Sequence, residues 1–227
     1  MTLPRPGRTV IFDLDGTLAD TSTDLLAAAN ATFGQAGLGA PLDARDTLTA
    51  FQGGRAMLRT GSARLGLGWD EDEVNRWYPR LLDAYRDGID THTVLYPGAV
   101  AAVERLRARG DRVGICTNKP DDLAETLLTR LGVRGLFASM VGAWTLPVAK
   151  PDPAPLRLAV ARAGGDMARA LLVGDTITDR RTGAAAGVPV VLVTFGPLGR
   201  SIASLEPDGL LDHYDTLEAE VDRLLGV

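Results

Sequence analysis

The sequence predicts an α/β fold: a Rossmann-like parallel sheet in a three-layer α/β/α core, interrupted by an inserted all-helical cap. Three observations support this. Residues 9–14 form an apolar strand that runs into two aspartates. Residues 23–90 show helical patterns and no convincing strand, and after them short apolar strands alternate with helices. The expected domains are an α/β core over residues 1–21 and 92–227 and a helical cap over residues 22–91.

The elements follow from periodicity and from the breaks between them. The first helix begins near Ser22, where apolar residues start to recur at helical spacing, and it stops at Gly37-Leu38-Gly39. Three further cap helices are expected, over residues 44–51, 55–65 and 71–86. In the core, we expect strands over 112–116, 139–141, 170–174 and 189–193, and helices over 99–109, 121–131, 155–163, 178–186 and 215–225.

Composition narrows the class of protein. The chain has 227 residues with a formal net charge of −5, which argues against nucleic acid or an acidic membrane surface as the main partner. Cys116 is the single cysteine, so no intramolecular disulfide can form, which fits a reducing compartment. With no signal-peptide core and no apolar stretch long enough to span a bilayer, we expect a cytoplasmic protein.

Polar residues gather where the predicted strands end. Because the carboxyl ends of parallel strands meet at one edge of a sheet, residues far apart in the chain should come together there. Three carboxylates around one point repel each other unless a cation lies between them, and hard oxygen ligands suit Mg²⁺. A threonine, a lysine and backbone amides beside them suit a phosphate. The residues concerned are Asp13, Asp15, Thr117, Asn118, Lys150, Asp175 and Asp179.

This arrangement resembles the haloacid dehalogenase superfamily of phosphatases. Its four motifs appear in order as Asp13-Leu14-Asp15-Gly16-Thr17, Thr117, Lys150, and Gly174-Asp175 with Asp179. The helical block lies where that family carries its α-helical cap. Within the family, the chain is most similar to phosphoglycolate phosphatases, through Asp20-Thr21, Thr117-Asn118-Lys119-Pro120, Leu146-Pro147 and Lys150-Pro151-Asp152-Pro153.

The resemblance implies a role for each catalytic residue. Asp13 would attack phosphorus and form an aspartyl-phosphate, which splits one difficult displacement into two easier ones. Asp15 would protonate the leaving oxygen and later deprotonate the attacking water. Thr117 and Lys150 would stabilise the charge on the transferring group.

The resemblance also implies the binding residues. Mg²⁺ would be held by Asp13, by the backbone carbonyl of Asp15 and by Asp175, while Asp179 would complete the metal shell or orient its waters and Lys150. The expected substrate- and phosphate-binding residues are Asp13, Leu14, Asp15, Thr117, Asn118, Lys150 and Arg55.

Three residues outside the motifs have two interpretations each. Arg55 follows the Gly53-Gly54 turn, and it either pairs with a substrate carboxylate in a forked geometry or is an exposed arginine at a helix start. Lys119 lines the entrance of the site or lies on the surface. Trp144 closes the site from one side or, as the preferred interpretation, is a half-buried packing residue.

The predicted function is a Mg²⁺-dependent phosphomonoesterase for a small phosphorylated metabolite, with phosphoglycolate the first choice. A sugar-phosphate phosphatase and a β-phosphoglucomutase-like phosphomutase are alternatives in the same superfamily. The phosphonate-cleaving branch relies on a cap lysine, and residues 23–90 contain none. A catalytically idle binding module would normally have lost Asp13, Asp15 or Lys150. The partner is a small phosphate ester, and the protein is expected to be a monomer or a homodimer.

Overall fold

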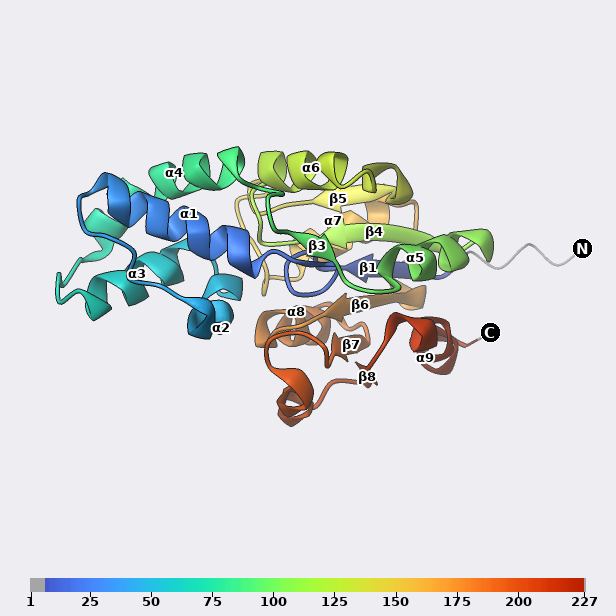
Figure 1. Ribbon diagram of the computed structural model, residues 1–227. Helices are drawn as coiled ribbons and strands as arrows, with labels where there is room; N and C mark the ends of the chain where they lie inside the picture. The colour runs from blue at the N-terminus through green and yellow to red at the C-terminus, as the bar shows by residue number, and fades with distance from the viewer. Residues whose placement is uncertain (1–6, 227) are drawn as a thin grey trace, which may run out of the picture. The chain divides into compact units, whose positions relative to one another are not determined.

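The computed structural model describes residues 7–226 and divides into two compact units (Figure 1). One unit combines Met1–Ala19 with Leu95–Val227, and the other is Asp20–Val94. We refer to them as the core unit and the helical unit. That they are a core domain and a cap domain with the predicted boundaries stays a prediction. Within the described residues, no helix is both long and apolar enough to cross a membrane.

The core unit contains a six-stranded, wholly parallel sheet, as the alternation of strands and helices predicted. Its spatial order is β5-β4-β1-β6-β7-β8. The unpredicted strand, β8, has only three residues, one of them a glycine, which is too short for a periodic pattern. The strands are β1 (Thr9–Phe12), β4 (Arg112–Cys116), β5 (Ser139–Val141), β6 (Ala170–Gly174), β7 (Val190–Val193) and β8 (Gly209–Leu211).

Strand β1 lies at the point where the strand order reverses. The chain moves outward from β1 to β4 and β5, then returns to β6 on the other side of β1. Such a reversal opens a crevice at the carboxyl ends of the strands. β1 ends at Phe12, two residues earlier than predicted, although the Asp13 amide still donates to the Val173 carbonyl at 2.8 Å. Asp13 therefore begins the loop at the crevice.

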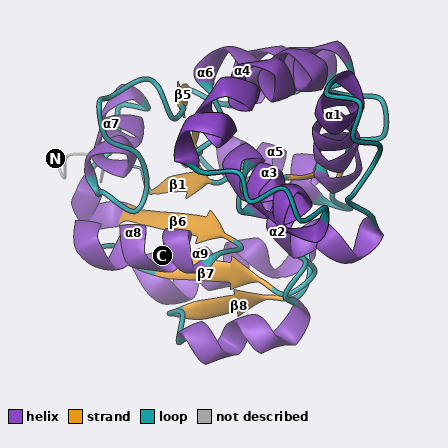
Figure 2. Ribbon diagram, turned by 90° about the vertical axis from the view of Figure 1, so that its left-hand side faces the viewer, coloured by secondary structure: helices purple, strands orange, loops and turns teal. Residues whose placement is uncertain are grey.

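Helices cover both faces of this sheet, so the three-layer core is confirmed (Figure 2). On one face, α7 packs on β4 and β5 while α8 packs on β6 and β7. On the other face, α5 packs on β4 and α9 on β6 and β8, and α6 meets α5 around an apolar pocket. The helices are α5 (Ala99–Ala108), α6 (Asp121–Arg130), α7 (Ala154–Arg162), α8 (Ile177–Ala186) and α9 (Leu217–Leu225).

The helical unit has no strand between its first and last residues. Its core includes a stack of aromatic rings, in which Phe33 lies on Trp69 with centroids 5.2 Å apart and Trp69 on Trp77 at 5.8 Å. Two-residue strands, β2 (Ala19–Asp20) and β3 (Val94–Leu95), pair where the chain passes between the units. The helices are α1 (Ser22–Gln35), the 3₁₀ turn η1 (Ala44–Asp46), α2 (Thr47–Phe51), α3 (Gly54–Arg64) and α4 (Glu71–Asp87).

Candidate active site

The register of the sheet brings three chain segments together. Phe12 pairs with Ile115 of β4 on one side and with Val173 of β6 on the other. The residues that follow these strands, Asp13, Thr117 and Asp175, therefore share the carboxyl edge of the sheet. All three side chains are buried. The polar strand ends thus converge on one point of the core unit.

Three carboxylates form a tight cluster at this edge. Oxygen atoms of Asp13, Asp175 and Asp179 lie within 4.8 Å of one another, and the three residues are 8%, 1% and 0% exposed. Burial raises the pKa of Asp13 to about 6, and repulsion by Asp179 and Asp15 adds to this shift while Lys150 opposes it. Burial, together with Asp179 and Asp13, raises the pKa of Asp175 well above its usual value. The cluster therefore carries more negative charge than its surroundings neutralise.

Lys150 provides the positive charge inside this cluster. Its Nζ lies 2.6 Å from Oδ1 of Asp179 and 3.1 Å from Oδ1 of Asp13, and its side chain is 1% exposed. Burial alone would lower the pKa of this lysine, but the two carboxylates outweigh burial and raise it. Lys150 is thus a permanent cation beside the carboxylate of Asp13.

Asp175 has the features expected of a metal ligand. Its Oδ1 accepts a hydrogen bond from Oγ1 of Thr17 at 2.9 Å. Its Oδ2 is buried and has no hydrogen-bond partner among the described residues. Since buried polar atoms are nearly always paired, an orphan carboxylate oxygen in a carboxylate cluster fits a bound cation. These oxygens suit Mg²⁺, which prefers hard oxygen ligands.

Two glycines leave room for the carboxylates. A Cβ atom at Gly16 would lie 2.3 Å from Oδ2 of Asp175, and the φ angle of Gly16 is +78°, which residues with a side chain rarely adopt. A Cβ atom at Gly174 would lie 2.4 Å from Cγ of Asp179. Any side chain at either position would push a carboxylate out of the cluster.

The start of α8 fixes the orientation of Asp179. Thr176 and Asp179 form a capping box, in which Thr176 Oγ1 donates to Asp179 Oδ2 at 2.6 Å and accepts from the Asp179 amide at 3.3 Å. With Oδ2 held by the cap, Oδ1 points to Lys150. The helix start therefore positions Lys150 through Asp179.

The segment Thr117-Asn118-Lys119 contacts two other parts of the site. Asn118 Nδ2 donates to the Lys150 carbonyl at 2.9 Å, and Asn118 Oδ1 accepts from the Lys150 amide at 3.0 Å. Lys119 is 5% exposed, and its Nζ donates to both carboxylate oxygens of Asp15 at 2.8 and 3.1 Å. Sequence reasoning left Lys119 between the entrance and the surface, whereas the structure buries it against Asp15.

Leu14 and Arg55, two of the expected phosphate- and substrate-binding residues, contact other residues of the protein. The Leu14 amide donates to Asp13 Oδ1 at 2.7 Å, and the Leu14 side chain is fully buried. Arg55 belongs to the helical unit, where it is exposed at the start of α3. Its Nε donates to Asn75 Oδ1 at 3.1 Å, and its guanidinium carbon lies 3.7 Å from the centroid of the Tyr78 ring.

Two further expectations concern residues of the core unit. Trp144 is 58% exposed, so the preferred interpretation of a half-buried packing residue is wrong. The backbone of its loop is held by a hydrogen bond that the Trp144 amide donates to Asp121 Oδ2 at 2.8 Å, while the indole ring is exposed. Cys116 is fully buried, and burial raises the pKa of its thiol to about 12, which fits the expected packing role.

Sequence reasoning did not predict the contacts that Thr17, Thr176 and Lys119 make in the site. Thr17 belongs to the first motif, but only the structure shows its hydroxyl on Asp175. Thr176 stands three residues before Asp179, and this spacing of a capping box was the available signal. No sequence signal places Lys119 on Asp15, because that contact depends on the β1–β4 pairing.

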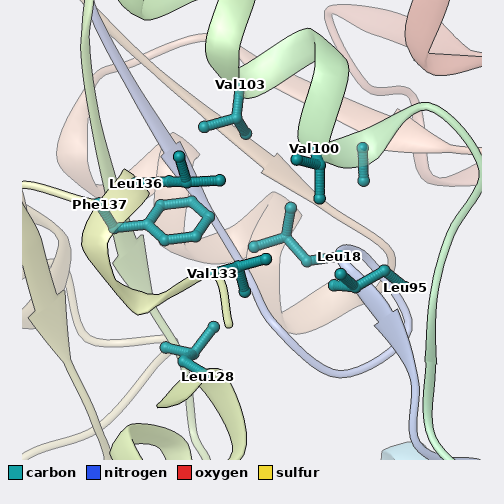
Figure 3. A pocket seen from close by; sticks show the side chains of 9 residues that line it. Leu18, Leu95, Val100, Val103, Leu128, Val133, Leu136 and Phe137 are labelled. Carbon is teal, nitrogen blue, oxygen red and sulfur yellow. The ribbon is translucent and has the colours of Figure 1, made fainter. Parts of the chain in front are cut away.

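An apolar pocket of the core unit differs in character from the carboxylate cluster (Figure 3). Aliphatic and aromatic side chains from α5, α6 and the segment after α6 surround it, and no charged group lines it. Such a lining offers nothing to a phosphate ester. The lining residues are Leu18, Leu95, Ala99, Val100, Val103, Leu128, Val133, Leu136 and Phe137.

Comparisons with known proteins identify the family of the chain. Residues 8–187 match the family model of haloacid dehalogenase-like hydrolases. The phosphoglycolate phosphatase of Mesorhizobium japonicum is 38% identical over 217 residues, covering 95% of this chain and 96% of that protein. The phosphoglycolate phosphatase of Caulobacter vibrioides is 37% identical, covering 92% and 88%. The crystal structure of a predicted phosphoglycolate phosphatase from Haemophilus somnus aligns with a TM-score of 0.83 at 26% identity, covering 94% and 97%.

Proposed function

This chain belongs to the haloacid dehalogenase-like hydrolases, and on that premise we propose that it is a Mg²⁺-dependent phosphatase that cleaves a small phosphomonoester through a covalent intermediate on Asp13. The observation that carries this proposal is the buried cluster of Asp13, Asp175 and Asp179 around Lys150. The cluster contains a nucleophile, hard metal ligands and a cation for phosphate at the crevice of the sheet.

Asp13 is the proposed nucleophile. Its Oδ1 accepts from the Leu14 amide at 2.7 Å and lies 3.1 Å from Lys150 Nζ, so the carboxylate is held in one orientation. With a pKa of about 6, Asp13 is mostly ionised at neutral pH, as an attacking carboxylate must be. Water is largely excluded around it, which strengthens the electrostatic interactions with the incoming phosphate.

Asp15 is the proposed acid and base. It lies two residues after Asp13 and is less buried, and its carboxylate is fixed by Lys119. It would give a proton to the leaving alcohol oxygen and then take one from the water that hydrolyses the aspartyl-phosphate. Thr117 and Lys150, both buried, would hold the oxygens of the transferring group.

Asp13, Asp175 and Asp179 are the proposed side-chain ligands of Mg²⁺, together with the backbone carbonyl of Asp15. The orphan Oδ2 of Asp175 supports this assignment, as does the excess of carboxylates over cations. When bound, Mg²⁺ would neutralise phosphoryl oxygens and offset the repulsion between the carboxylates. Asp179 is already committed to Lys150 and to the start of α8, so orienting Lys150 is its second proposed role.

The proposed substrate is 2-phosphoglycolate. Two relatives that align over most of this chain carry the name phosphoglycolate phosphatase, and the four motifs lie within residues 8–187, which match the family model. Arg55 stays a candidate for the substrate's carboxylate, with its guanidinium held by Asn75 and Tyr78. A small phosphate ester as partner, a monomer or homodimer and a cytoplasmic location complete the proposal.

Phosphate release tests the proposal directly. The purified chain is assayed with 2-phosphoglycolate, glucose 6-phosphate, β-glucose 1-phosphate and an aryl phosphate, each with Mg²⁺ and with EDTA. We expect 2-phosphoglycolate to have the highest kcat/KM and EDTA to abolish turnover. Asp13→Asn is the matched control, since it keeps the size of the side chain and removes the nucleophile.

The outcome also separates the alternatives. Preference for sugar phosphates would move the substrate to the sugar-phosphate phosphatases and leave the mechanism unchanged. Conversion of β-glucose 1-phosphate into an isomer would indicate a phosphomutase. Phosphate release no faster than that of Asp13→Asn would contradict the enzyme proposal and favour an idle binding module.

A further inference from the structure

Lys119 is a buried cation that the mechanism so far uses only as a contact of Asp15. Its side chain is 3% exposed, while that of Asp15 is 19% exposed. Its Nζ contacts both oxygens of Asp15, at 2.8 and 3.1 Å. Burying an ammonium group is costly, so a lysine kept at this position calls for a purpose beyond charge balance on a partly exposed aspartate.

Because Lys119 contacts Asp15, the position of Asp15 determines which part of the substrate lies near Lys119. In the proposed reaction Asp15 protonates the ester oxygen of the leaving alcohol, so its carboxylate must lie within hydrogen-bond distance of that oxygen. An ammonium group in contact with the same carboxylate therefore lies beside the leaving alcohol. Lys150, in contrast, contacts Asp13 and Asp179 and lies on the side of the transferring phosphoryl group.

We infer that Lys119 is the specificity-determining residue that pairs with an anionic group on the alcohol part of the substrate. This inference rests on the proposed phosphatase function and names the class of ester. In 2-phosphoglycolate the carboxylate is attached to the carbon that carries the ester oxygen. The ammonium group of Lys119, which contacts Asp15 beside the ester oxygen, is therefore within reach of this carboxylate. It is not within reach of a charge that lies several carbons from the ester oxygen.

The same geometry ranks the candidate substrates. A short ester with a carboxylate next to its ester carbon provides Lys119 with a charge-assisted hydrogen bond in a site with little water, where such bonds are strong. A neutral alcohol of the same size does not provide one. A sugar places hydroxyl groups there, which leaves the charge of Lys119 without a partner from the substrate.

A pair of substrates that differ only in having a carboxylate or a methyl group at this position tests the inference. We compare kcat/KM for 2-phosphoglycolate and for ethyl phosphate, in the wild type and in Lys119→Met. The methionine keeps the length of the apolar stem and removes the charge. We expect the ratio of the two constants to fall by about 10- to 100-fold, the usual effect of losing one hydrogen bond to a charged group. Lys119→Arg, which keeps the charge, should retain most of the ratio.

Binding provides a readout that does not depend on turnover. In 3-phosphonopropionate a methylene group replaces the ester oxygen of 2-phosphoglycolate, and propylphosphonate lacks the carboxylate. By calorimetry with Mg²⁺ present, the wild type should bind 3-phosphonopropionate about 10-fold or more tightly than propylphosphonate. Lys119→Met should bind the two with nearly equal affinity.

Several results would overturn the inference. An equal loss of kcat/KM for both esters would make Lys119 a positioning residue of Asp15 only. An unchanged ratio in Lys119→Met together with a collapsed ratio in Arg55→Met would assign the carboxylate to Arg55. Either result would leave the proposed phosphatase function intact. A wild type that binds both phosphonates equally contradicts the inference even if no ester is hydrolysed, so the two proposals fail separately.

Discussion

Strand β1 carries a buried ionic cluster at each end, and the two clusters differ in their charge balance. Before β1, Arg8 donates to both oxygens of Asp111 at 2.9 Å and also bonds Asp222, which Arg109 contacts as well. Here two arginines meet two carboxylates. After β1, three carboxylates lie together, Lys150 contacts only Asp13 and Asp179, and one oxygen of Asp175 has no partner among the described residues.

The difference separates a structural cluster from a functional one. The donors of Arg8 are taken up by Asp111, Asp222 and the Gly226 carbonyl, so nothing further is needed there. The cluster after β1 is incomplete without an added cation, and burial together with repulsion between carboxylates raises the pKa of Asp13 and of Asp175. Incomplete neutralisation thus marks the end of the strand at which we propose that ligands bind. Four predictions test this contrast, beginning with the largest expected effect.

Replacing the nucleophile should abolish activity without weakening the fold. In Asp13→Asn we expect kcat to fall by at least about 1,000-fold, because no covalent intermediate can form. The melting temperature should stay constant or rise, since one of three crowded charges is removed. Steady-state kinetics and thermal unfolding measure both. A folded variant that keeps a tenth of the wild-type kcat would contradict the role of Asp13.

Breaking the cluster of Arg8, Arg109, Asp111 and Asp222 should weaken the fold without changing activity. In Arg8→Met we expect the free energy of unfolding to fall by about 3 kcal/mol, because the deeply buried Asp111 loses its close partner, while Asp222 keeps Arg109. Denaturant unfolding measures the loss, and kcat of the folded protein should not change. The double variant Arg8→Met with Asp111→Leu is the control, since it leaves no buried charge unpaired at that position and should recover part of the stability. An equal loss in both variants would refute the explanation from charge balance.

Added Mg²⁺ should stabilise the protein in a pH-dependent way. The pKa of Asp13 is raised from 3.8 to about 6 in the fold, so the folded chain holds a proton that the unfolded chain releases. Its contribution therefore lowers stability as pH rises through this window, and a cation that binds the ionised form offsets the loss. At 100 times its Kd, Mg²⁺ should add about 2.7 kcal/mol at about pH 7.5, and much less at about pH 5.

Thermal unfolding with and without Mg²⁺ at the two pH values measures this effect. Asp175→Asn is the control, because it keeps the side-chain size and removes the charge at the orphan oxygen. We expect its Mg²⁺-dependent shift to be strongly reduced at both pH values. A shift in the wild type that does not depend on pH would place the cation elsewhere.

The smallest effect concerns the support of Lys150. Asn118 holds the Lys150 backbone with two hydrogen bonds, and we expect Asn118→Ala to lower kcat by about tenfold as the ammonium group loses its position. In a Lys150→Met background the same change should cost little, because nothing remains to be positioned. The double-mutant cycle measures this coupling. Equal losses in both backgrounds would give Asn118 a direct role with the phosphate.

The sequence predicted the parallel sheet well because most of its strands are short apolar runs separated by helical patterns. Strands β4, β5 and β6 match their expected ranges residue for residue. Strand β8 was missed because three residues with a glycine show no periodicity. The end of β1 was placed too late, because Leu14 continues the apolar pattern after the strand has ended.

The sequence predicted which residues form the site, because each of them lies in a local motif, but it did not predict their contacts with distant segments. Asp13, Asp175 and Asp179 come together as their strand and helix positions imply. The contacts of Asn118 with Lys150 and of Lys119 with Asp15 link segments 32 and 104 residues apart, and no local pattern records them. Tertiary packing decides which donor bonds to which acceptor, and no local sequence pattern predicts these pairs.

The central place of β1 also has a consequence during synthesis. β1 is made before its neighbours, yet its partner strands begin only at Arg112 and Ala170. On the ribosome, the backbone of Thr9–Phe12 therefore stays unpaired while about one hundred further residues are synthesised. Apolar strands tend to associate with other chains in this state. The charges that flank it, Arg8 and Asp13, resemble the gatekeepers that limit such association. Arg8, which stabilises the fold, and Asp13, the proposed nucleophile, would first protect the unfinished chain.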